Sequence, residues 1–99
     1  LKSFLYYLFM IKERVITIIK KSGMKNPELE AKTGIGRYTW QNVRNKPERE
    51  LKTEEIEAIV KLFPHYALWI ASGEIAPEIG QTSPEYDEVN SKLDSHAEG

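Results

Sequence analysis

The chain has no cysteine among its 99 residues. A disulfide scaffold, a thiolate nucleophile and a cysteine-ligated zinc site are therefore excluded within it. Long apolar runs are also missing, because the longest nearly uninterrupted one, Phe4 to Ile11, is far shorter than the roughly 18 residues of a membrane span. No small-residue cleavage site follows this run, which argues against a signal peptide. We expect a cytoplasmic protein that does not associate with a membrane.

Patterns that carry catalysis or metal binding are equally scarce. His65 and His96 lie far apart in the sequence and belong to no ligand spacing. No glycine-rich phosphate loop precedes a helix, and no serine has a suitable histidine and aspartate constellation. Glu54 and Glu55 stand where a helix start favours negative charge, which explains them without a site. We expect no enzymatic activity, no cofactor, no metal and no small-molecule substrate.

The net charge of -1 conceals two opposed halves of the chain. Residues 1 to 52 hold 12 Lys and Arg against 5 Glu, whereas residues 53 to 99 hold 2 Lys against 10 Asp and Glu. The halves therefore carry +7 and -8. A strongly basic half suggests a polyanionic partner, and the acidic half cannot approach that partner closely.

Apolar residues recur at helical spacing, and no strict alternation of apolar and polar residues lasts long enough to predict a strand. We therefore predict an all-α protein with a compact five-helix domain over residues 9–76. The first helix carries the stripe Leu8, Ile11, Val15, Ile18 and Ile19 and ends at Ser22-Gly23; the others span about Pro27 to Thr33, Arg37 to Asn45, Thr53 to Phe63 and Tyr66 to Ala71. In this scheme Asn26 is the expected N-cap of the second helix.

The two ends of the chain receive separate predictions. Residues 1–8 form an apolar N-terminal extension of the first helix, which either mediates self-association or folds back on its own domain. Met10 is a candidate biological start. Residues 77–99 form a flexible, acidic and largely irregular tail, with a short helix near residues 86–93. This tail is either a solubilising segment or, as a weaker hypothesis, a competitor of the polyanionic partner for the basic face.

The third predicted helix has two unlike faces. At 100° per residue, Trp40 and Val43 point in the direction of Gly36. The opposite side is polar and consists of Tyr38, Gln41, Asn42 and Asn45, with Arg37 flanking. No Asp or Glu occurs between Ala31 and Pro47, although that stretch contains several Lys and Arg. Asn and Gln can pair with adenine and Arg with guanine, so this face suits base recognition. The alternative is that this helix is simply basic and exposed to solvent and has no role in recognition.

These residues resemble a known family. The stretch TGIGRYTWQNVRN, Thr33 to Asn45, resembles the helix-turn-helix of Cro and CI-type phage repressors, the XRE-like regulators. The stretch FPHYALWIASGE, Phe63 to Glu74, resembles the closing helix of a phage-repressor-like subgroup. The resemblance covers about residues 9–83, and its matching positions are Leu29, Gly34, Ile35, Thr39 and Val43. It departs at Glu30, where the family more often has a small Ala.

The resemblance implies a lambda-repressor-like domain that regulates transcription, with its third helix in the major groove of double-stranded DNA. The implied base contacts are Arg37, Tyr38, Gln41 and Asn42. The implied backbone contacts are Lys25, Asn26, Arg44 and Lys46. A homodimer acting as a repressor would place its half-sites about 34 Å apart. The alternative is an antitoxin-like or adaptor module that uses the same helical domain and the acidic tail to bind a protein.

Overall fold

The computed structural model describes residues 2–98, with the side chains of residues 4–93. Over this range it contains six α-helices and two short 3-10 helices, and its only β-type pairing is an isolated bridge between Ala76 and Gln81. The elements are α1 (Lys2–Ser22), α2 (Asn26–Thr33), α3 (Arg37–Asn45), α4 (Thr53–Leu62), η1 (Pro64–Tyr66), α5 (Ala67–Ser72), η2 (Pro77–Ile79) and α6 (Pro84–Glu98). The all-α class is confirmed, and α2 to α5 begin and end within one or two residues of the predicted limits.

The helices α2 and α3 are separated by a tight turn at Gly34. Pro27 stands in the first turn of α2, where its missing N–H costs no hydrogen bond. Gly34 has a φ of 76°, a left-handed conformation that favours glycine, and its N–H donates to the carbonyl of Glu30. The chain therefore turns within a few residues and packs α3 against α2.

One hydrophobic core joins the first five helices. Its buried members are Val15, Ile18 and Ile19 of α1, Leu29 of α2, Trp40 and Val43 of α3, Ile59 of α4 and Ile70 of α5. The predicted apolar stripe of α1 thus supplies three of these residues. Because α3 contributes a tryptophan and a valine to the centre of this core, its position and rotation are fixed by packing.

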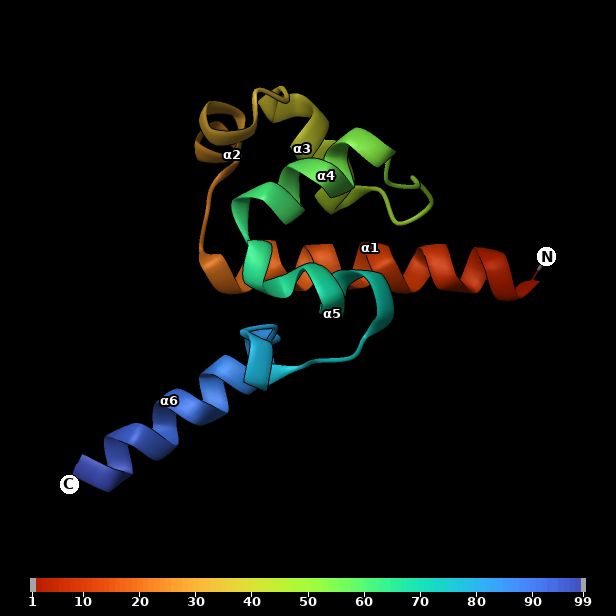
Figure 1. Ribbon diagram of the computed structural model, residues 1–99. Helices are drawn as coiled ribbons and strands as arrows, with labels where there is room; N and C mark the ends of the chain where they lie inside the picture. The colour runs from red at the N-terminus through yellow and green to blue at the C-terminus, as the bar shows by residue number, and fades with distance from the viewer. Residues whose placement is uncertain (1, 99) are drawn as a thin grey trace.

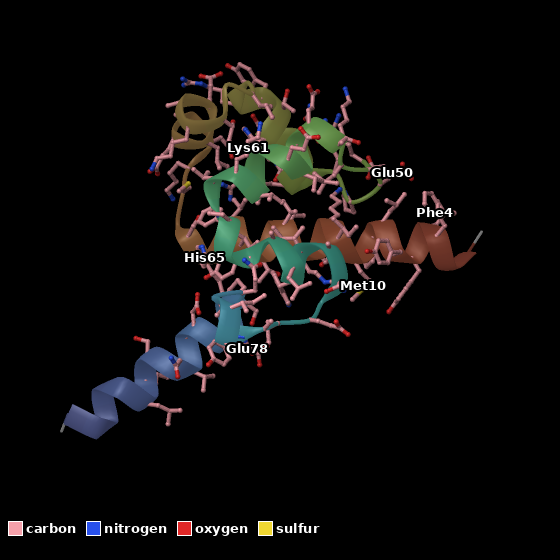
Figure 2. All side chains as sticks on the ribbon, viewed as in Figure 1. Phe4, Met10, Glu50, Lys61, His65 and Glu78 are labelled. Carbon is pink, nitrogen blue, oxygen red and sulfur yellow. The ribbon has the colours of Figure 1, made fainter. Side chains whose placement is uncertain are left out.

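The long helix α1 divides the molecule (Figure 1). The helices α2, α3 and α4 lie on one side of it, and α6 projects away on the other side, beyond α5. Figure 2 shows that Phe4 lies near the N-terminal end of α1, beyond the body of the domain. Between residues 2 and 98, no helix combines the length and the apolar character needed to cross a membrane.

Residues 84–98 form the helix α6, which contains the short helix predicted near residues 86–93 and is longer than it, so this part of the chain is not irregular. Buried Ser83 stabilises the start of this helix by accepting the N–H of Tyr86 with its hydroxyl at 3.1 Å. Tyr66 donates to Asp87 Oδ2 at 2.8 Å, and Lys21 pairs with Glu88 at 2.5 Å. These contacts join α6 to η1 and α1. They connect residues that lie far apart in the sequence, so helical periodicity does not predict them. Leu1 and Gly99, which belong to the two predicted end segments, lie outside the described residues.

Candidate nucleic-acid interface

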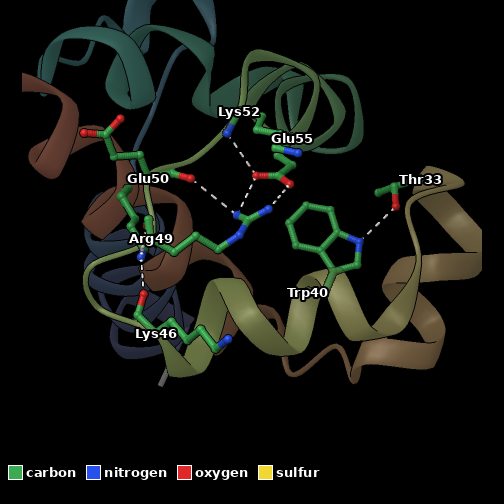
Figure 3. Close-up of polar contacts among 8 residues, drawn as sticks. Thr33, Trp40, Lys46, Arg49, Glu50, Lys52 and Glu55 are labelled. Atoms are coloured by element: carbon green, nitrogen blue, oxygen red, sulfur yellow. Dashed lines mark hydrogen bonds and ion pairs between the residues drawn. The ribbon is translucent and has the colours of Figure 1, made fainter.

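The inner face of α3 is locked into the core. The side chains of Trp40 and Val43 are fully buried. The indole Nε1 of Trp40 also donates to the hydroxyl of Thr33 at 3.2 Å (Figure 3), which ties α3 to the end of α2. The rotation of α3 about its own axis is therefore set, and its other face must point away from the core.

That outer face is polar and exposed. It consists of Arg37, Tyr38, Gln41, Asn42 and Asn45, all of them solvent-exposed. Tyr38 is 75% exposed, so its ring and its hydroxyl group are both open to solvent. The predicted division of this helix into an apolar and a hydrogen-bonding face is confirmed. The four residues predicted to contact bases lie on this one face.

The N-terminal end of α3 is held by a carboxylate from α2. Glu30 Oε2 accepts the backbone N–H of Arg37 at 2.9 Å. Glu30 Oε1 accepts Nε and Nη2 of the Arg37 side chain at 2.9 and 2.8 Å. The backbone and side-chain hydrogen bonds from Arg37 lower the pKa of the Glu30 carboxyl group. Glu30, the position that departs from the family pattern, thus binds the first residue of the candidate recognition helix.

The C-terminal end of α3 is held by an arginine. Arg44 donates from Nε to Asn26 Oδ1 at 2.7 Å and from Nη2 to the carbonyl of Met24 at 2.6 Å. Burial lowers the pKa of the Arg44 guanidinium. The expectation that Asn26 is an N-cap is wrong: Lys25 occupies the N-cap position, and no side chain caps the turn. The amide of Asn26 is turned toward Arg44.

The loop that follows α3 is held in place by a buried lysine of α1. Lys12 of α1 is 4% exposed. Its ammonium group donates to the carbonyls of Lys46 at 2.8 Å and Pro47 at 3.4 Å, and also to the carbonyl of Arg49. The side chain of Lys46 remains exposed. The ammonium group of Lys12 thus binds three carbonyls and holds the backbone of the loop from which the Lys46 side chain projects.

A second arginine-glutamate pair stands where the same loop enters α4 (Figure 3). Arg49 donates from both Nη atoms to Glu55 at 2.9 and 2.7 Å, and Glu55 also accepts the backbone N–H of Lys52 at 2.9 Å. Burial alone would raise the pKa of the Glu55 carboxyl group, but these hydrogen bonds outweigh it and the pKa is lowered. The hydrogen bonds that Arg49 donates to Glu55 raise the pKa of the Arg49 guanidinium.

The predicted site residues fall into three places. Arg37, Tyr38, Gln41 and Asn42 share the outer face of α3. Asn26 and Arg44, 18 positions apart in the chain, are in direct contact, and exposed Lys25 adjoins them in sequence. Lys46 follows the last turn of α3.

Sequence reasoning missed the roles of Glu30 and Lys12. The signal for Glu30 was its own departure from the family pattern, seven positions before an arginine that opens a helix. The signal for Lys12 was a lone cation close to the apolar stripe of α1. In the described residues, no three histidine or acidic side chains are grouped so that they could hold a metal ion.

The chain is similar to a solved phage protein. The structure of Pf6r from the filamentous phage Pf6 of Pseudomonas aeruginosa PA01 matches it with a TM-score of 0.75 and 42% sequence identity, over 84% of this chain and 95% of Pf6r. No family model matches the chain. No curated protein matches it either. Because the identity is high and extends over nearly all of Pf6r, the chain belongs to the same protein family as Pf6r.

Proposed function

We propose that the protein is a sequence-specific regulator of transcription that binds double-stranded DNA without catalysing a reaction. The observation that carries the proposal is the outer face of α3, which exposes five hydrogen-bonding side chains while Trp40 and Val43 anchor the inner face. A helix-turn-helix unit places such a second helix in the major groove. The kinship with a protein of a filamentous phage is consistent with a phage regulator. The Cro/CI-like kind rests on the resemblance of residues 33–45 to the helix-turn-helix of those repressors.

The exposed side chains of α3 have the chemistry that base recognition requires. In the proposed complex Gln41 and Asn42 pair with adenine through their amide groups, and Arg37 pairs with guanine. Tyr38 contacts a thymine methyl group or a phosphate. Because α3 itself contains no carboxylate, nothing on the helix repels the DNA backbone.

Three cations and one amide, from the start of α2 and from the end of α3, would fix the position of the α2–α3 unit on the duplex. Lys25 and Asn26 at the start of α2, and Arg44 and Lys46 at the end of α3, would contact phosphates. Phosphate contacts determine affinity and register, whereas base contacts determine sequence choice. The acidic helix α6 lies on the far side of α1 from α2 and α3 (Figure 1), so its charge would not face the DNA.

A homodimer is part of the proposal, with half-sites about 34 Å apart, one turn of DNA. Exposed apolar side chains support self-association: Phe4, Leu5, Tyr6, Tyr7 and Phe9 of α1 and Val89 and Leu93 of α6 are all more than 45% exposed. Sedimentation at several concentrations, with and without DNA, measures the oligomeric state. If the protein is a monomer that binds single half-sites with full specificity, the proposed dimer is wrong, but the proposed role of α3 still holds.

Selection of bound sequences from a random DNA pool, followed by affinity measurements at several salt concentrations, tests the proposal. We expect one enriched motif. Gln41→Ala should relax selectivity at one position of that motif, whereas Lys46→Ala should weaken binding to all duplexes and reduce the salt slope by about one charge. Equal losses on specific and random duplex for Gln41→Ala would contradict the assignment of Gln41 as a base contact.

The exposed apolar residues of α6 favour a second candidate, an antitoxin-like or adaptor module that binds a protein. The two candidates differ in their response to low salt. Complete absence of DNA binding at low ionic strength, where even non-specific association is strong, would defeat the regulator and leave the adaptor.

A further inference from the structure

Glu30 occupies one particular edge of the Arg37 guanidinium. Its Oε1 accepts both Nε and Nη2, while its Oε2 accepts the backbone N–H of the same residue. Three hydrogen bonds thus connect one carboxylate of α2 to the first residue of α3. A long side chain that would otherwise sample many rotamers is held at the N-terminal end of the helix.

The contact leaves the opposite end of the guanidinium available. A guanidinium has five N–H donors. Glu30 engages the side formed by Nε and Nη2, so the donors at the tip, on Nη1 and Nη2, still form a parallel pair. Such a pair is the geometry that O6 and N7 of guanine require in the major groove. Arg37 is 48% exposed at its side chain even with Glu30 bound, so a base edge can reach it.

We propose that Glu30 is a positioning residue that orients Arg37 toward a guanine and thereby determines sequence specificity. The inference rests on the proposed function, because it names the base that one residue of α3 recognises. Glu30 also places a negative charge 2.8 Å from the guanidinium of Arg37. Arg37 therefore contributes to base selection and little to non-specific attraction by phosphates.

This division of roles predicts two opposite effects of one substitution. In Glu30→Gln the carbamoyl oxygen can still accept the backbone N–H of Arg37, but the charge that orients the guanidinium is gone. Selectivity for guanine should fall about three- to tenfold, the order of the cost of ordering one long side chain on binding. Affinity for random duplex should rise, because Arg37 becomes an unpaired cation.

The matched control is Glu28→Gln, on the same helix and with the same change in charge. Glu28 is paired with Lys32 at 3.8 Å and not with Arg37. It should strengthen binding to every duplex equally and leave the selectivity for guanine unchanged. Arg37→Lys keeps a cation but lacks the two-pronged tip, so it should lose the guanine selectivity even if Glu30→Gln proves unstable.

The experiment measures affinity by fluorescence anisotropy for the selected duplex and for duplexes with each guanine-cytosine pair exchanged for adenine-thymine. Thermal unfolding of each variant verifies its fold. The proposal is overturned if Glu30→Gln keeps the wild-type ratio between these duplexes, including the case in which both affinities rise by the same factor as in Glu28→Gln. A wild-type protein without any sequence preference would overturn the proposed function together with this inference, so the two failures are distinguishable.

Discussion

The two junctions on either side of α3 are built from the same chemical parts. At the junction of α2 and α3, Glu30 accepts a backbone N–H at a helix start and the guanidinium of Arg37. At the junction of α3 and α4, Glu55 does the same with the N–H of Lys52 and the guanidinium of Arg49. The pairs differ in burial: the Glu55 side chain is 1% exposed and that of Glu30 is 36% exposed.

The difference in burial assigns different tasks to the two pairs. Removing either partner of a buried ion pair leaves the charge of the other without compensation, so the Arg49–Glu55 pair is needed for the fold. An exposed pair contributes little to stability because water and salt screen it. The Arg37–Glu30 pair is thus free to serve recognition, since disturbing it does not endanger the domain.

The largest expected effect is on stability, from Glu55→Gln. This substitution leaves Arg49 without its anionic partner, and we expect a loss of about 3 kcal/mol in the free energy of unfolding. Urea unfolding followed by tryptophan fluorescence measures it. The control is Glu54→Gln, an exposed neighbour in the same helical turn, for which we expect a change within about 0.5 kcal/mol. Equal effects of the two substitutions would show that the buried Arg49–Glu55 pair does not stabilise the fold.

Lys12→Met removes the other support of the loop between α3 and α4. The carbonyls of Lys46, Pro47 and Arg49 would lose their common donor, and we expect a loss of about 2–3 kcal/mol. The exposed Lys20 of the same helix provides the control substitution, Lys20→Met. If both variants unfold at the same urea concentration, the ammonium of Lys12 does not stabilise this loop.

Acid should separate the two junctions further. The folded-state pKa of Glu55 is lowered, so its contribution to stability is present above the unfolded pKa of about 4.3 and is lost as the pH falls through the folded pKa. The pKa of Glu30 is lowered in the same direction, but its pair is exposed. We expect the fall in Tm between about pH 5 and pH 3 to shrink more in Glu55→Gln than in Glu30→Gln. The reverse order would contradict the assignment of tasks.

The smallest expected effect is on the stability of Glu30→Gln at neutral pH. Its Tm should fall less than that of Glu55→Gln and should stay near that of the Glu28→Gln control, because both glutamates lie in exposed ion pairs. Calorimetry on the three variants checks this order. A large drop for Glu30→Gln would mean that this pair supports the fold as well.

The helical part of the fold was predictable because its signals are local. The spacing of Val15, Ile18 and Ile19, together with Pro27 and Gly34 as boundary residues, predicts helices that the structure confirms. The two faces of α3 follow from the same periodicity. Physical rules about neighbours three or four residues apart suffice for both.

The remaining features depend on contacts between distant residues. Lys12 meets carbonyls 34 to 37 positions later, and Lys21 meets Glu88 across 67 positions. Such contacts leave no periodic trace in one sequence. This explains why the sequence predicts only a short helix near residues 86–93 where the structure has α6, and why Glu30 stands out in the sequence only as a departure from a pattern. The family resemblance implies a phosphate contact for Arg44, but it does not predict the hydrogen bonds that Arg44 donates to Asn26 and Met24.

The central claim is that the outer face of α3 meets DNA. A titration of ¹⁵N-labelled protein with its selected duplex tests it most directly, through changes in backbone amide shifts. We expect the largest changes in α3, residues 37–45, and at the start of α2, with little change in α6. Large changes confined to α6 and the N-terminal part of α1, with those of α3 unmoved, would contradict the claim.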